Sequence, residues 1–160
     1  MGADAVIAIG GKLRTYLQLG RISNLPTVWT NVLAGMVLTG GPVTLPHVVG
    51  LTAALSLFYI GGMFLNDAFD REHDRVIRPD RPIPAGMATP REVLTIGFGL
   101  LAGGLLVLGY FAAQGGRQLL AAGILLALLI VFYDLHHKQN PWSPLVMGLC
   151  RAMVYVISGL

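Results

Sequence analysis

The stretch LNDAFDREHDRVIRPDRPIP, residues 65 to 84, carries much of the charge of a chain that is otherwise nearly uncharged. The sequence has 19 Lys, Arg, Asp and Glu residues, and 11 of them lie between Asp67 and Glu92. Charge gathered in one segment of an apolar chain indicates a site with a chemical or recognition role.

The flanking sequence has the composition of a membrane protein. Apolar residues make up 54% of the chain and charged residues 12%, against about 25% charged residues in an average soluble domain. Since a helix needs about 20 apolar residues to cross a bilayer, the sequence predicts an all-α integral membrane bundle with five spans in this chain. The predicted spans are residues 24–42, 46–65, 92–113, 117–134 and 144 onward.

We expect residues 1–21 to form a cytoplasmic N-terminal segment and residues 22–160 to be the N-terminal part of one transmembrane domain. The first segment has no small-residue cleavage site after an apolar run, which argues against a cleavable signal peptide. The sequence ends in VISGL, inside the fifth predicted span, so we expect a longer chain. Gly40-Gly41-Pro42 and Gly115-Gly116 predict turns, and Gly99 with Gly103 predicts a close helix contact.

The basic residues are distributed unevenly about the predicted spans. Nine lie in the first segment and in the loops after the second and fourth spans, whereas the other side has only Arg117. Because basic loops stay in the cytoplasm, the N-terminus and the charged segment are predicted to face the cytoplasm across the plasma (inner) membrane. This asymmetry also accounts for the net charge of +3, so we predict no nucleic-acid partner.

The acidic residues of the charged segment repeat at helical spacing. If the second span continues as a helix to Pro79, Asp67, Asp70 and Asp74 lie on one face, flanked by Asn66. Three carboxylates on one stripe repel one another unless a cation neutralises them. Oxygen ligands favour Mg²⁺ over zinc, and Mg²⁺ is commonly held by carboxylates together with substrate phosphates.

The basic residues of the segment suit the phosphate part of such a site. Arginine binds phosphate oxygens in a two-pronged fork, and four arginines are available: Arg71, Arg75, Arg78 and Arg81. In a simpler interpretation, Arg71 and Arg75 pair with the aspartates as helix neighbours and the arginines only orient the chain. The segment as a whole favours a Mg²⁺-diphosphate site at the membrane surface.

Two adjoining motifs resemble those of a known family. Residues 66–74, NDAFDREHD, are similar to the NDxxDxxxD signature of the UbiA superfamily of intramembrane prenyltransferases, and residues 78–86, RPDRPIPAG, resemble the RPxRPIPSG segment that follows it. The resemblance implies a bundle of about nine spans with a central cavity. It also implies Mg²⁺-dependent transfer of an isoprenoid from its diphosphate.

Residue by residue, the resemblance makes Asp67, Asp70 and Asp74 catalytic and, with Asn66, the Mg²⁺ ligands. It assigns Asn66, Arg78 and Arg81 to diphosphate binding. Tyr133 and Lys138 lie where relatives have Tyr-x-x-x-Lys, although Lys138 is five residues after Tyr133. The family's second motif, DxxxD, does not occur after Asp134, so we expect it in a later part of the protein.

Arg151 is a candidate diphosphate-binding residue on physical grounds. An arginine inside a membrane span is costly and usually faces a cavity or a partner.

The predicted reaction is transfer of a prenyl group to an aromatic or hydroxyl-bearing lipophilic acceptor inside the membrane. The predicted partners are a prenyl diphosphate, the acceptor and the lipid bilayer, and the sequence does not predict an oligomeric state. One alternative is a membrane transporter or structural subunit. Another is an enzyme like the CDP-alcohol phosphotransferases, whose Asp-Gly-x-x-Ala-Arg motif is absent here. Metal-dependent binding of a prenyl diphosphate distinguishes the prediction from both.

Overall fold

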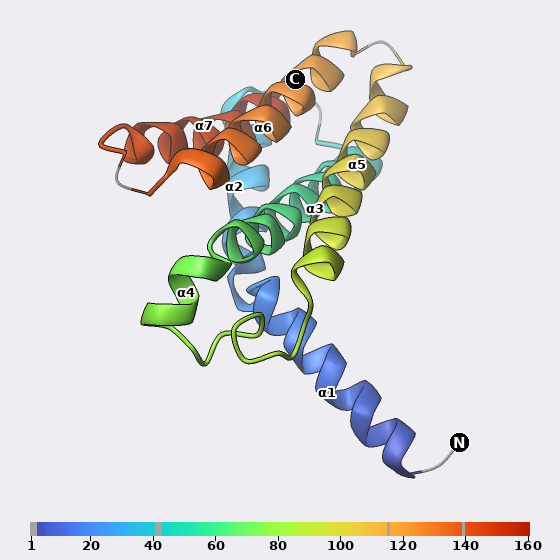
Figure 1. Cartoon of the computed structure of the whole chain (residues 1–160). Helices are drawn as coiled ribbons and strands as arrows, with labels where there is room; N and C mark the ends of the chain where they lie inside the picture. Colours follow the sequence, from blue (N-terminus) through green and yellow to red (C-terminus); the bar gives the residue numbers. More distant parts are fainter. Residues whose placement is uncertain (1–2, 41–42, 115, 139) are drawn as a thin grey trace.

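The computed structural model describes residues 3–40, 43–114, 116–138 and 140–160, which fold into helices joined by short connections (Figure 1). Gly41, Pro42 and Gly115, from the predicted turns, lie outside these residues. The elements are α1 (Ala3–Leu19), the short 3₁₀ helix η1 (Ile22–Asn24), α2 (Leu25–Leu38), α3 (Leu45–Phe69), α4 (Arg71–Ile77), α5 (Pro90–Ala112), α6 (Arg117–His136) and α7 (Ser143–Gly159).

The all-α membrane fold predicted from the sequence is confirmed for the described residues. Among them α3, α5 and α6 are long and apolar enough to cross a membrane. The first and fifth predicted spans are also helical, but α2 has 14 residues and α7 has 17. These two helices are shorter than the roughly 20 residues that cross a bilayer. The sequence did not predict α1, which extends from the bundle toward the N-terminus (Figure 1).

Local sequence explains where the helices begin. Proline occupies one of the first two positions of α2, α3, α5 and α7, where its missing N–H costs no hydrogen bond. At α5, the Thr89 hydroxyl accepts a hydrogen bond from the Glu92 amide, and the Glu92 carboxylate accepts one from the Thr89 amide. This capping box satisfies two amides of the first turn.

Helix α3 lies at the centre of the bundle, where it packs against α2, α5 and α6 (Figure 1). Its buried side chains include Leu55 and Phe58, which join Leu108 of α5 in one apolar core. The outer faces are apolar as well: Leu106 on α5 is 75% exposed and Leu128 on α6 is 61% exposed. Large apolar side chains on the outside of long helices are expected where lipid surrounds the bundle.

The close approach of α3 and α5 uses glycines other than the predicted pair. A Cβ atom at Gly61 would lie 2.9 Å from the carbonyl oxygen of Gly97, so neither position has room for a larger residue without a shift. By contrast, a Cβ at Gly99 would meet nothing within 4 Å, and one at Gly103 would make an ordinary contact of 3.6 Å. Among the residues that the structure describes, the predicted close contact at Gly99 is therefore not formed, because Gly99 lies on a different side of α5 from Gly97.

The predicted continuous helix through the charged segment is also wrong. Helix α3 ends at Phe69, and α4 starts at Arg71 in a new direction (Figure 1). Asp70 joins them with φ −79° and ψ −5°, whereas a regular helix has ψ near −42°. Aspartate is less favourable inside a helix than at its end, so Asp70 is a suitable residue for the junction.

Candidate functional site

The three predicted aspartates lie at the junction of α3 and α4, and all three are buried. Asp67 is 7%, Asp70 9% and Asp74 4% exposed. The loop between α4 and α5 folds back over them, and the C-terminal end of α6 borders them. Because a buried carboxylate needs a partner, each aspartate is expected to contact a cationic side chain or a hydrogen-bond donor.

Arg81 joins two of the aspartates. Its Nη1 atom donates to Asp67 Oδ1 at 2.9 Å and to Asp74 Oδ2 at 2.7 Å. The loop that carries Arg81 is held by turns: the Ala85 amide donates to the Arg81 carbonyl at 2.9 Å, and Gly86 has φ +74°. Glycine adopts this left-handed conformation without the strain that a side chain adds. The RPDRPIPAG segment therefore positions Arg81 against the acidic cluster.

Asp70 instead contacts the two residues that follow α6. Lys138 Nζ lies 3.0 Å from Asp70 Oδ1, and His137 Nε2 lies 3.4 Å from Asp70 Oδ2. The Tyr133 ring stacks on the His137 ring with centroids 5.0 Å apart. Lys138 therefore lies at Asp70, and Tyr133 packs against the neighbouring His137.

Asn66 contacts a carboxylate that the sequence prediction did not include. Its Nδ2 atom donates to Asp134 Oδ1 at 3.3 Å, and Asp134 is 5% exposed. The sequence could have indicated Asp134 as a candidate, because it is an acidic residue at the end of an apolar run and directly follows Tyr133.

Arg21 is a second residue that the prediction missed. Its Nη2 atom lies 3.5 Å from Asp67 Oδ1. Its backbone has φ 44° and ψ 47°, a left-handed conformation that is uncommon for residues other than glycine. Such conformations concentrate at functional sites.

Two contacts to Glu92 of α5 fix the helix that leads to Arg21. The Tyr16 hydroxyl donates a hydrogen bond to the Glu92 carboxylate, and Lys12 Nζ lies 3.5 Å from it. The Glu92 carboxylate raises the pKa of the Tyr16 hydroxyl, because the hydrogen bond to Glu92 favours the neutral phenol. Helix α1 is therefore tied to the bundle next to the acidic cluster.

Other predicted residues do not reach the aspartates. Arg78 is exposed and has no ion pair among the described residues, and Arg151 is exposed on α7. Arg71 and Arg75 lie 3.4 and 3.3 Å from Glu72. The simpler interpretation, in which Arg71 and Arg75 neutralise the three aspartates, therefore does not describe this structure.

The donor chemistry of the cluster fits Mg²⁺. Asn66, Asp67, Asp70 and Asp74 offer oxygen atoms, and Asp134 Oδ2 is the buried side-chain oxygen that lacks a hydrogen-bond partner among the described residues. Those residues contain no group of three His, Cys, Asp or Glu side chains already placed to hold a metal ion. The nearby cationic side chains neutralise Asp67, Asp70 and Asp74 instead.

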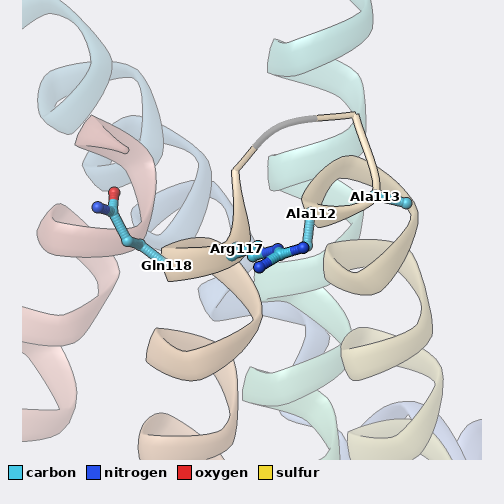
Figure 2. Close-up of a pocket in the computed structure, with 4 residues that line it drawn as sticks. All are labelled: Ala112, Ala113, Arg117 and Gln118. Carbon is cyan, nitrogen blue, oxygen red and sulfur yellow. The ribbon is translucent and has the colours of Figure 1, made fainter.

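An open pocket lies elsewhere in the bundle. Figure 2 shows it between the end of α5 and the start of α6, lined by Ala112, Ala113, Arg117 and Gln118. The aspartates lie near the opposite ends of these two helices, so this pocket is not part of the acidic cluster.

Fold and site together define a membrane helix bundle with paired acidic and basic side chains at one end. A sequence profile of the UbiA prenyltransferase family matches residues 27–160. The chain belongs to the UbiA prenyltransferase family, as its motifs predicted.

Two similar proteins share one name. The chain is 34% identical over 128 residues to the digeranylgeranylglyceryl phosphate synthase of Methanothrix thermoacetophila, a match that covers 79% of this chain and 46% of the relative. It is 37% identical over 131 residues to the protein of that name from Ignicoccus hospitalis, covering 81% and 41%. The chain thus spans about half the length of the curated relatives that it matches.

A solved structure has the same fold. A solved structure whose description names digeranylgeranylglyceryl phosphate synthase in membranes superposes on this chain with a TM-score of 0.83. The match covers 92% of this chain and 52% of that one at 24% identity. At this identity the likeness establishes the fold alone.

Proposed function

We propose that the full-length protein transfers a prenyl group from an isoprenoid diphosphate to a lipophilic acceptor inside the membrane, with Mg²⁺ as cofactor. The observation that carries this proposal is the cluster of three buried aspartates, each within reach of a cationic side chain, at the end of an apolar bundle. Membership of the UbiA prenyltransferase family supports it.

The chemistry needs stabilisation of the leaving group. The carbon–oxygen bond of an allylic diphosphate breaks when the charge that develops on the diphosphate is neutralised. Mg²⁺ supplies part of this neutralisation when it is bound, and Asn66, Asp67, Asp70 and Asp74 are the residues that would hold it.

The basic side chains supply the remaining contacts. Arg81, Arg21 and Lys138 donate to the aspartates in this structure, and the same donors suit the oxygens of a diphosphate. Tyr133, Arg78 and Arg151 remain predicted diphosphate contacts. The apolar bundle accommodates the prenyl chain and keeps water from the carbocation.

The relatives point to a class of acceptor and donor. Because they are named digeranylgeranylglyceryl phosphate synthase, we propose a geranylgeranyl diphosphate donor and a glyceryl phosphate lipid acceptor. The hydroxyl oxygen of the acceptor forms the new bond to the prenyl carbon, diphosphate leaves, and the hydroxyl proton is released. A glyceryl phosphate acceptor adds a second anionic group, which the basic side chains at this end of the bundle can attract.

Product analysis tests the proposal. Full-length protein in lipid nanodiscs is given a panel of prenyl diphosphates with aromatic and glyceryl phosphate acceptors, with and without Mg²⁺, and the products are identified by mass spectrometry. We expect an ether product that needs Mg²⁺. Absence of any prenylated product from the panel would favour a transporter or structural subunit, and transfer of a phosphoalcohol group would favour the phosphotransferase alternative.

Sidedness has its own test. We propose that the acidic cluster faces the cytoplasm, because nine basic residues flank that side and one flanks the other. Single cysteines at Ala85 and Gln114, both exposed, are introduced after Cys150→Ala removes the native thiol. In intact cells, we expect an impermeant maleimide to label position 114 and not position 85. The reverse pattern, or labelling of both positions from outside, contradicts this topology.

A further inference from the structure

Asp134 differs from the other buried aspartates of the site. It lies in α6, a helix long and apolar enough to span the membrane, and it is 5% exposed. Its Oδ1 accepts a hydrogen bond from Asn66, and within the described part of the chain its Oδ2 has no partner and neither oxygen forms an ion pair. A buried carboxylate without a cationic partner is costly. Its presence at position 134 therefore indicates a role that a neutral side chain does not fill.

The hydrogen bond to Asn66 determines which way the Asn66 amide points. Asn66 Nδ2 donates to Asp134 Oδ1, and an ionised carboxylate enforces this direction because it only accepts hydrogen bonds. The Asn66 Oδ1 atom is then not used in the contact with Asp134. Asn66 directly precedes Asp67 and lies one helical turn before Asp70, so this oxygen belongs to the same end of α3 as the two carboxylates.

A hydrogen bond that only links two helices does not require a charged side chain. Elsewhere in this bundle neutral side chains form such bonds: the Tyr155 hydroxyl donates to Asn31 Oδ1 at 3.0 Å, and Trp29 Nε1 donates to Ser56 Oγ at 3.0 Å. An asparagine at position 134 could also bond to Asn66. Two amides can pair with either one as the donor, however, and this pairing leaves the orientation of Asn66 open.

We infer that Asp134 is a positioning residue that holds Asn66 with Nδ2 toward α6 and Oδ1 available as a ligand for the metal-diphosphate group. This rests on the proposed function, which makes Asn66 a ligand. Residues that orient a ligand in this way commonly change metal affinity 10- to 100-fold when they are altered. Asp134 therefore acts on the site through Asn66 and does not contact the substrate itself.

The first experiment measures metal binding without turnover. Full-length protein in nanodiscs is titrated with Mn²⁺, an oxygen-binding stand-in for Mg²⁺, in the presence of inorganic diphosphate, and free Mn²⁺ is followed by electron paramagnetic resonance. We expect Asp134→Asn to weaken Mn²⁺ binding about tenfold. The matched control is Asn31→Ala, which removes another polar contact between helices outside the acidic cluster, and we expect its Mn²⁺ affinity to equal that of the wild type.

A double-mutant cycle tests whether Asp134 acts through Asn66. In an Asn66→Ala background, Asp134→Asn should cause no further loss of Mn²⁺ affinity. The exchanged pair, Asn66→Asp with Asp134→Asn, keeps one amide and one carboxylate, and we expect it to recover most of the affinity. It also serves as the test variant if Asp134→Asn alone does not fold.

The outcomes separate this inference from the proposed function. Wild-type affinity in Asp134→Asn, an equal loss in the Asn66→Ala background, or no recovery in a folded exchanged pair overturns the positioning role and leaves the proposed function intact. Wild-type protein that binds no Mn²⁺ with diphosphate overturns the proposed function, and the positioning role with it.

Discussion

Changing Asp70 to asparagine in the full-length protein is expected to lower turnover at least 100-fold while the protein remains folded in the membrane. The substitution keeps the size of the side chain but removes the charge that we propose holds Mg²⁺ against the diphosphate. A 100-fold loss corresponds to about 2.7 kcal/mol of transition-state stabilisation. Asp67→Asn should have an effect of the same order, and both are measured as initial rates at saturating Mg²⁺.

Glu72→Gln is the matched control for the loss of one acidic charge. Glu72 lies in the same segment, but its side chain is 65% exposed and pairs only with Arg71 and Arg75 among the described residues. We expect it to keep nearly the full rate. If Asp67→Asn or Asp70→Asn keeps more than a tenth of the wild-type rate, the metal role proposed for that residue is wrong.

Much of the fold could be predicted because membrane spans are a property of local composition. The uncharged runs predicted α3, α5 and α6 to within a few residues. The break at Asp70 could not be predicted in this way, since the helical spacing of the acids also fits an unbroken helix. The contact between Gly61 and Gly97 was missed for a related reason: many glycines occur in α5, and only packing against α3 determines which of them face it.

The candidate site was predictable where its residues lie close together in the sequence. Asp67, Asp70, Asp74 and Arg81 all lie within 15 residues, and the structure brings them together. Arg21 comes from the connection between α1 and η1, Asp134 from α6, and His137 from the position just after α6. Their proximity therefore depends on tertiary structure. Arg21 is the last basic residue before the long uncharged run, a position that could have marked it as a candidate.

Arg81→Gln is expected to be among the most destabilising changes at the site. Arg81 is the cation that joins Asp67 and Asp74, and the side chains of these aspartates are only 8% and 5% exposed. Removing one partner of a buried ion pair leaves an uncompensated charge and commonly costs about 3 kcal/mol or more. Arg75→Gln is the matched control, because Arg75 is 70% exposed and pairs with the exposed Glu72, and an exposed pair contributes little.

Arg81→Lys separates the structural role of Arg81 from its proposed role in substrate binding. A single nitrogen, Nη1, makes both contacts to the aspartates, so one ammonium group that reaches them can replace it. Lysine cannot form the two-pronged contact that arginine makes with phosphate oxygens. We therefore expect a thermal midpoint close to that of the wild type but a KM for prenyl diphosphate raised about tenfold. A lysine variant as unstable as Arg81→Gln would show that the aspartates need the full guanidinium group. A stable variant with unchanged KM would exclude Arg81 from diphosphate binding and leave it the neutralising partner of Asp67 and Asp74.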